Sequence, residues 1–195
     1  MIKSKTRART LINVIGIPSL LAIIYYGGNI FTAFIYLVMF LCTYELSNIC
    51  NIKGYTLHKN FLYVIYLFMY LAYFSNFSVF NLNVVCISLF LLLFMFEIYN
   101  RNKYALENIA ITILAFVWIG YFLNKAVYLR STYDGFEIIL TIFLSVWVCD
   151  SAAFIVGTKI GKRKIAPSIS PNKTWEGTVA GYVFSTLFIY LLVSN

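Results

Sequence analysis

Long apolar runs alternate with short polar or basic segments along this chain. A helix that crosses the hydrocarbon core of a bilayer needs about 20 predominantly apolar residues. The pattern predicts seven spans, over residues 10–26, 30–50, 60–75, 82–99, 106–128, 136–156 and 176–193. The first and third runs are short, which makes them candidates for partial placement at the membrane interface. The prediction is therefore an all-α, polytopic integral membrane protein with about seven transmembrane helices, and residues 1–195 as a single membrane domain.

The composition supports this prediction. Hydrophobic residues make up 62% of the chain and charged residues only 11%, with a mean hydropathy of +0.83. A soluble domain of this length could not bury so much apolar surface, so the bilayer must act as its solvent. The net charge of +8 comes from residues in the gaps between apolar runs. We expect them to meet membrane lipids with anionic head groups, and we expect no nucleic acid as a partner.

The basic residues also predict the orientation. Thirteen of the fifteen lie in the N-terminal tail and in segments 51–59, 100–105 and 157–174, and the other two are Lys125 and Arg130. Positively charged loops stay on the cytoplasmic side of a membrane. The N-terminus and the 157–174 loop are therefore predicted to be cytoplasmic, and seven spans put the C-terminus on the other side. The expected location is the inner (cytoplasmic) membrane, as a multi-pass protein.

One carboxylate lies inside an apolar run. Asp150 follows residues 138–149, which carry no other charge, near the cytoplasmic end of the sixth predicted span. A charge at such depth costs about 2.5–3.5 kcal/mol on insertion scales, and membrane proteins keep one where it pairs with a cation or a metal. Asp150 is therefore a candidate metal ligand. The alternative is an interfacial residue that is hydrated or paired with Lys159.

The 157–174 segment is rich in basic residues and contains no acid. Its cations are Lys159, Lys162, Arg163, Lys164 and Lys173. An ordinary cytoplasmic loop would look similar, but Gly157 and Gly161 permit close approach of the backbone to a ligand. Their spacing does not fit a phosphate-binding P-loop. We expect this segment to be a cytoplasmic substrate-binding loop.

The end of this loop predicts a helix start. Ser170 followed by Pro171 is typical of an N-cap and a first helical position. Such a start would direct free N–H groups at an anion, with Lys173 and Thr174 beside them. Glu176 then has two candidate roles, as a carboxylate that stabilises the helix start or as a group close to a metal.

These residues also resemble a known family. The string Asp150-Ser-Ala-Ala-Phe, the pair Gly161-Lys162, Pro167 and the string Ser170-Pro-Asn-Lys-Thr-Trp-Glu-Gly177 are similar to the central motif of phosphatidate cytidylyltransferases, also called CDP-diacylglycerol synthases. The stretch 9–18 and the pair Tyr44-Glu45 are similar too, but less specific. The resemblance covers most of the chain and is strongest over residues 147–177.

The resemblance implies an enzyme of phospholipid biosynthesis. It would condense CTP with phosphatidic acid, giving CDP-diacylglycerol and diphosphate. It implies Mg²⁺ as the cofactor, with Asp150 as a metal ligand, directly or through water, and Asp150 and Lys173 as the catalytic residues. The residues expected to contact the nucleotide phosphates are Lys162, Arg163, Ser170, Thr174 and Glu176.

The sequence departs from the family pattern at its end. Family members continue into a signature with Lys-Asp, His-Gly-Gly and an Asp-Arg-x-x-Asp-like element that supplies further metal-binding aspartates. After Gly177 this sequence contains no Asp, Arg, Lys or His. It therefore corresponds to the N-terminal two-thirds of the family fold, and we expect it to make little CDP-diacylglycerol alone. A homodimer and a separately encoded C-terminal portion are the protein partners left open.

Two other functions stay open. One is a CTP-dependent transferase that acts on a different lipid. The other is a small membrane transporter or structural protein, with Asp150 on an ion path. Transport would place polar residues along several spans, whereas the middle portions of these spans are almost purely apolar. The pattern favours the enzyme.

Overall fold

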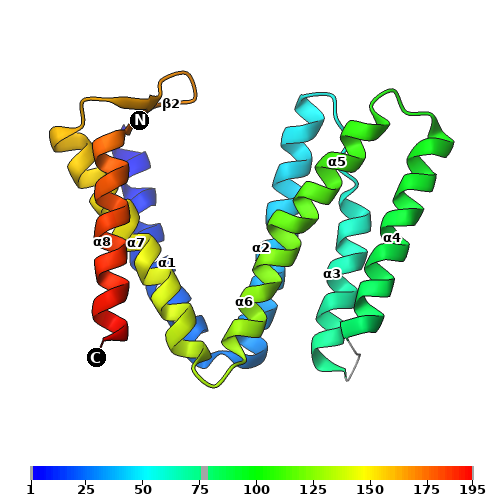
Figure 1. Cartoon of the computed structure of the whole chain (residues 1–195), viewed down its shortest axis with the longest axis horizontal. Helices are drawn as coiled ribbons and strands as arrows, with labels where there is room; N and C mark the ends of the chain where they lie inside the picture. The colour runs from blue at the N-terminus through cyan, green and yellow to red at the C-terminus, as the bar shows by residue number, and fades with distance from the viewer. Residues whose placement is uncertain (1, 76–78, 195) are drawn as a thin grey trace. The chain divides into compact units, whose positions relative to one another are not determined.

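The computed structural model describes residues 2–75 and 79–194, most of them in helices (Figure 1). In chain order the elements are α1 (Ile2–Tyr26), α2 (Gly28–Ile52), α3 (Lys59–Phe74), α4 (Val79–Asn100), α5 (Ala105–Ala115), the π-helix η1 (Phe116–Tyr121), α6 (Phe122–Arg130), α7 (Gly135–Ile160), β1 (Lys164–Ala166), β2 (Ser170–Thr174) and α8 (Trp175–Val193).

Each predicted apolar run coincides with a helix. Within the described residues, four helices are long and apolar enough to cross a membrane: Gly28–Ile52, Ala105–Arg130, Gly135–Ile160 and Trp175–Leu192. Three shorter apolar helices cover Val14–Tyr26, Lys59–Phe74 and Cys86–Asn100. The expectation of an all-helical membrane protein is confirmed, with a small β-hairpin that the sequence pattern did not predict.

The contacts divide the chain into two units. The hairpin unit consists of residues 1–25 and 132–195, and therefore holds α1, α7, the two strands and α8. The bundle unit consists of residues 26–131 and holds α2 to α6.

Polar contacts lie among the apolar side chains inside the bundle unit. The Tyr36 hydroxyl donates to Asn124 Oδ1 at 2.8 Å, and the hydroxyls of Thr43 and Tyr66 share a hydrogen bond at 3.0 Å. Tyr66 is completely buried and Tyr36 nearly so. Helices in a bilayer have little hydrophobic drive to associate, so small residues and interhelical hydrogen bonds stabilise their packing. These pairs connect α2 to α3 and to α6.

The π-helix keeps one helical face on the interior of the bundle unit. From Ile109 onward, the buried positions along α5, η1 and α6 are spaced three or four residues apart, except for a step of five from Ala115 to Gly120. A step of five matches the i→i+5 hydrogen bonding of a π-helix. A Cβ atom on Gly120 would lie 2.7 Å from the Tyr66 ring, so glycine is what lets Tyr66 pack here.

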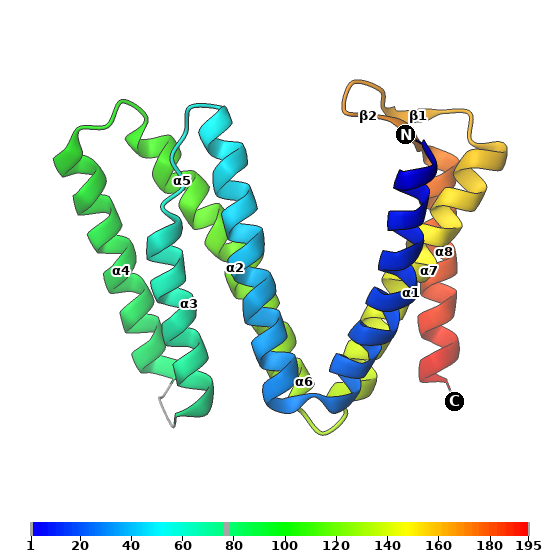
Figure 2. The ribbon, with the colours of Figure 1, turned by 180° about the vertical axis from the view of Figure 1, so that it is seen from behind.

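Close packing of α7 against α8 dominates the hairpin unit. A Cβ atom on Gly177 would lie 2.6 Å from the Ala153 carbonyl oxygen and 3.0 Å from the Gly157 Cα. A Cβ atom on Gly181 would lie 2.8 Å from the Cys149 carbonyl oxygen. Glycines four residues apart permit such close approach of helix backbones in membranes. The strands join the ends of these helices, and α1 begins at the same end of the unit (Figure 2).

Candidate functional site

The segment between α7 and α8 forms an antiparallel β-hairpin. Lys164 pairs with Thr174 and Ala166 with Ser170, with a register shift between the two pairs. The predicted helix start at Ser170 and Pro171 is therefore wrong, because both residues lie in β2. A two-stranded ribbon has only edge strands, where proline is tolerated.

Thr174 provides the helix cap instead. α8 begins at Trp175, and Thr174 Oγ1 accepts a hydrogen bond from the Gly177 N–H at 3.3 Å. Threonine, like serine, is among the favoured N-cap residues. The cap therefore lies four residues beyond the predicted one at Ser170.

Thr174 is also surrounded by glycine. Its side chain is only 3% exposed. Cβ atoms on Gly157, Gly161 and Gly177 would each lie within 3.1 Å of Thr174 Oγ1. The three glycines thus make room for this side chain between the strand and both helices. A contact of Thr174 with a phosphate, as predicted, would require these atoms to separate.

Glu176 binds the start of the hairpin. Its Oε2 accepts hydrogen bonds from the backbone N–H groups of Lys162 at 3.1 Å and of Arg163 at 3.3 Å. The Trp175 N–H in turn donates to the Arg163 carbonyl oxygen at 2.9 Å. Of the two roles considered for Glu176, the geometry matches a structural one at the helix start. The predicted contact of its carboxylate with a nucleotide complex stays a prediction.

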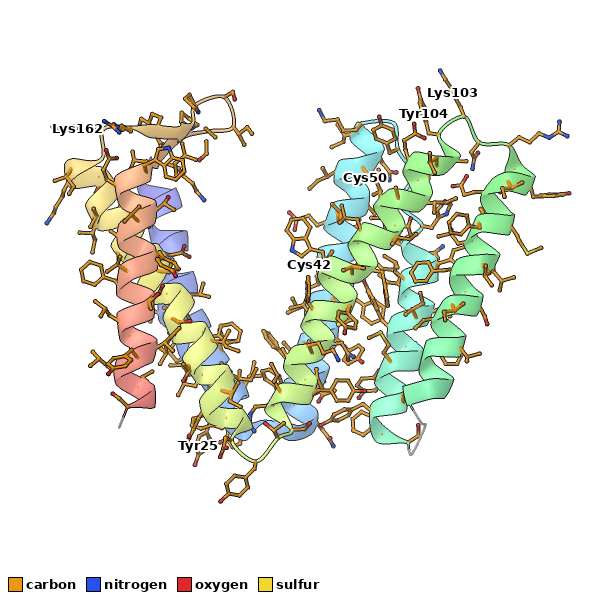
Figure 3. All side chains as sticks on the ribbon, viewed as in Figure 1. Tyr25, Cys42, Cys50, Lys103, Tyr104 and Lys162 are labelled. Carbon is orange, nitrogen blue, oxygen red and sulfur yellow. The ribbon has the colours of Figure 1, made fainter. Side chains whose placement is uncertain are left out.

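The basic side chains of the hairpin remain exposed. Lys162, Arg163, Lys164 and Lys173 are all solvent-accessible, and Ser170 is half-buried at the start of β2. Lys162 lies at the hairpin end of its unit (Figure 3). Because the Glu176 carboxylate accepts hydrogen bonds from backbone N–H groups, the four cationic groups are left available for an anion.

Asp150 lies away from the hairpin along α7. The helix continues to Ile160, beyond the predicted end at residue 156. Ten residues separate Asp150 from that end, which is about 15 Å at a rise of 1.5 Å per residue. The Asp150 side chain is exposed and makes no hydrogen bond or ion pair with any described residue, so the alternative pairing with Lys159 is not observed. The structure therefore does not bring Asp150 and Lys173 into direct contact.

The described residues provide too few metal-binding side chains to hold Mg²⁺ unless a bound ligand or water contributes further oxygen atoms. No group of three or more His, Cys, Asp or Glu residues occurs within the described part of the chain. Mg²⁺ commonly takes one or two carboxylates and completes its shell with water and substrate phosphates. A site with one carboxylate, such as that of Asp150, is compatible with this coordination.

An apolar cavity opens beside this part of α7, which the sequence pattern did not single out. It has a volume of about 510 Å³ and lies between the α7 residues Trp147, Ser151 and Ile155 and the α8 residues Phe184 and Phe188. The α7 residues recur at a spacing of four, which places them on one helix face. This four-residue spacing is the sequence pattern that could have indicated the cavity. Cavities of this size can hold a small ligand or part of a larger one.

Comparison with known proteins identifies the family. The cytidylyltransferase family matches residues 7–195. The phosphatidate cytidylyltransferase of Staphylococcus haemolyticus is 28% identical over 93% of this chain and 69% of its own length. That of Staphylococcus saprophyticus is 30% identical over the same shares, and that of Bacillus subtilis is 28% identical over 97% of this chain and 72% of its own.

No solved structure is significantly similar to this chain. The family match nevertheless includes all of α7, the hairpin and α8, where the cations and Asp150 lie. It also includes the whole bundle unit. This chain belongs to the cytidylyltransferase family.

Proposed function

We propose that this membrane protein acts as a phosphatidate cytidylyltransferase, which transfers the cytidylyl group of CTP to phosphatidate. The products are CDP-diacylglycerol and diphosphate. The observation that carries the proposal is the family match over residues 7–195, joined by relatives that bear this name over most of the chain. The exposed cations at the end of two apolar helices supply the chemistry that two anionic substrates require.

The reaction is a displacement at phosphorus. A phosphate oxygen of phosphatidate attacks the α-phosphorus of CTP, and the bond from that phosphorus to the bridging oxygen of the β-phosphate breaks. Diphosphate leaves with the bonding electron pair. Because both reactants are anions, catalysis depends mainly on orientation and on neutralising charge.

The hairpin provides the groups for that task. Lys162, Arg163 and Lys173 bind the phosphates of CTP, and the Ser170 hydroxyl donates a hydrogen bond to the same group. Arginine can bind two phosphate oxygens at once, whereas lysine acts as a point charge. Thr174 and Glu176 contribute to phosphate binding through the hairpin backbone, which they fix to α8.

Asp150 provides one carboxylate ligand for Mg²⁺. When bound, Mg²⁺ supplies positive charge and orientation at the CTP phosphates. Pairing with a cation also offsets the cost of a carboxylate ten residues inside a membrane helix. Water and oxygens of the CTP phosphates would complete the coordination. The apolar cavity between α7 and α8 then accommodates part of an acyl chain.

The proposed topology has seven spans, with the N-terminus and the hairpin in the cytoplasm and the protein in the inner membrane. Its support is the distribution of thirteen of fifteen basic residues. Within the bundle unit, the loops after α2 and α4 also lie at one end (Figure 1). A cysteine placed at Ser168 in a cysteine-free variant should react with an impermeant maleimide only in inside-out vesicles. Labelling in right-side-out vesicles would contradict the orientation.

Nucleotide binding and turnover test the function separately. With CTP and Mg²⁺, residues 157–177 of the purified chain in nanodiscs should become resistant to proteolysis. Lys173→Ala and Asp150→Asn should weaken that protection, and Lys125→Ala should not. Formation of labelled lipid from phosphatidate and CTP radiolabelled at the α-phosphate would demonstrate the reaction, and little labelled lipid is expected from residues 1–195 alone. Absence of CTP-dependent protection, or equal protection by GTP, would refute the assignment.

A further inference from the structure

A buried carboxylate organises the loop end of the bundle unit. Glu97 of α4 is fully buried, and its oxygens accept hydrogen bonds from the side-chain amides of Asn102 at 2.5 Å and Asn108 at 3.1 Å. It also shares a hydrogen bond with His58 Nε2. The negative charge of Glu97 is therefore enclosed by polar partners and does not face solvent.

The same cluster fixes the backbone before α3. The Thr56 N–H donates to Asn108 Oδ1 at 2.9 Å, and the His58 N–H donates to Thr112 Oγ1 at 3.2 Å. Both acceptors belong to α5, and both side chains are nearly fully buried. The segment 56–58 is thus held in one conformation by side chains of another helix.

A cavity of about 320 Å³ with both polar and apolar lining residues lies against this fixed segment. Its polar lining includes Asn51, Thr56, His58, Lys59 and Asn60, and no carboxylate lines it. Amide, hydroxyl and ammonium groups can all donate hydrogen bonds to an anion. The N-terminus of the 16-residue helix α3 adds its positive dipole end at the same place.

One wall of the cavity is aromatic. Phe61 and Phe96 line it, with ring centroids 6.1 Å apart. The Lys59 ammonium lies 4.9 Å from the centre of the Tyr44 ring, a cation–π contact that restricts its position. The cavity therefore combines polar lining residues, with Lys59 among them, and an apolar side, as the junction between a phosphate and hydrocarbon requires.

The surroundings of the cavity are basic. Lys53, Arg101 and Lys103 lie in the loops at this end of the bundle unit, where Lys103 and Tyr104 mark the turn between α4 and α5 (Figure 3). Basic clusters at the end of membrane helices attract anionic head groups. The exposed acids nearby in sequence, Glu45 and Glu107, do not line the cavity.

We infer that this cavity binds the phosphate of an anionic phospholipid head group, with the glycerol end of the lipid against Phe61 and Phe96. The site belongs to the bundle unit and uses none of the residues assigned to CTP. It is therefore independent of the proposed cytidylyl transfer. Its occupant is a structural or regulatory lipid.

Native mass spectrometry of the full chain with phosphatidylglycerol tests the inference, because that lipid is neither substrate nor product of the proposed reaction. Lys59→Gln should weaken phosphatidylglycerol binding about tenfold, because it removes a charge-assisted hydrogen bond to the phosphate and not only a surface charge. Asn60→Glu should weaken it further, since it places a carboxylate in the cavity. Binding of phosphatidylcholine should not change. Lys53→Gln is the control, because it removes a nearby charge that does not line the cavity.

Thermal unfolding of each variant separates loss of the site from loss of the fold, and Asn60→Glu is suited to this because acids are favoured in a first helical turn. Equal losses in Lys59→Gln and Lys53→Gln would indicate general surface charge and overturn the inference. So would unchanged binding in the Lys59 and Asn60 variants. Binding of inorganic phosphate without any binding of phosphatidylglycerol would show a free-phosphate site and would also overturn it.

Discussion

The Glu176 carboxylate accepts a hydrogen bond from the backbone N–H of Lys162 at 3.1 Å. The first turn of α8 therefore binds the chain as it leaves α7, and this contact does not use the Lys162 ammonium. The hairpin presents its cations from a backbone fixed at both ends. A loop that was only positively charged would lack this restraint.

Removing the Glu176 carboxylate should release the start of the hairpin. In Glu176→Ala, the amides of Lys162 and Arg163 lose their acceptor, so both should exchange hydrogen several-fold faster. Glu176→Gln retains a carbonyl acceptor and should show a smaller change. Hydrogen–deuterium exchange of residues 161–166 measures both. Glu137→Gln, at the start of α7, is the control and should leave that segment unchanged; equal exchange in all variants would contradict the structural role.

Enlarging Gly177 should separate α7 from α8. In Gly177→Ala the new Cβ would meet backbone atoms of Ala153 and Gly157, which cannot move aside as a flexible side chain can. Overpacking of this kind costs about 1–3 kcal/mol. The midpoint of thermal unfolding in detergent should fall accordingly. Val179→Leu enlarges an exposed residue of the same helix and should have little effect, and a matching loss there would argue against the glycine contact.

The hydrogen bond between Tyr36 and Asn124 should stabilise the bundle unit. Tyr36→Phe removes the donor and leaves the buried Asn124 Oδ1 without it. Hydrogen bonds between membrane helices contribute about 0.6 kcal/mol on average, with a maximum near 1.7 kcal/mol. A double-mutant cycle with Asn124→Ala should give a coupling energy in that range. Additive losses would show that the two side chains do not interact.

Truncating Glu97 should destabilise the loop end of the bundle unit strongly. Glu97→Ala leaves His58, Asn102 and Asn108 without this acceptor, and of these three donors Asn108 is buried. An unpaired buried donor costs about 1–3 kcal/mol. The measurement is the free energy of unfolding by denaturant in mixed micelles. The exposed Glu107 offers a matched control, since Glu107→Ala should change stability by less than about 0.5 kcal/mol. Similar losses in the free energy of unfolding in both variants would contradict the structural role assigned to the buried Glu97 carboxylate.

Lys173 should contribute directly to CTP affinity. Lys173→Ala should raise the Kd for CTP with Mg²⁺ about tenfold, the equivalent of 1.4 kcal/mol. Isothermal titration would measure it. Because Lys173 is exposed, its contribution should shrink as salt is added. Lys159→Ala, on the last turn of α7, is the comparison. A larger loss of affinity there than at Lys173 would indicate that the phosphates bind near the end of α7 and not at β2.

The long apolar runs were enough to locate the helices. Runs of 16 or more apolar residues have few alternatives in a bilayer, because helices satisfy every backbone hydrogen bond internally. The pattern also singled out Asp150 and the basic segment, since charge stands out against an apolar background. It placed Asp150 nearer the helix end than it is, because Gly157 and Thr158 were taken as loop residues although α7 continues to Ile160.

The hairpin could not be predicted in the same way. Ser170-Pro171 and Thr174-Trp175 are both reasonable helix starts by local preference, and the choice depends on strand pairing with Lys164. The buried position of Thr174 depends on glycines that are far from it in sequence. The link between Glu97 and His58 likewise joins residues 39 positions apart, which no local pattern encodes.

The glycine contacts of α7 and α8 begin within a turn of the points where the two helices meet the hairpin. The cations of the hairpin can therefore move little relative to the membrane-embedded parts of α7 and α8. A lipid phosphate diffuses laterally at nearly constant depth, whereas CTP arrives from solution in three dimensions. If the hairpin holds CTP at the depth of the lipid phosphates, the lipid needs only to diffuse laterally within the membrane to reach it.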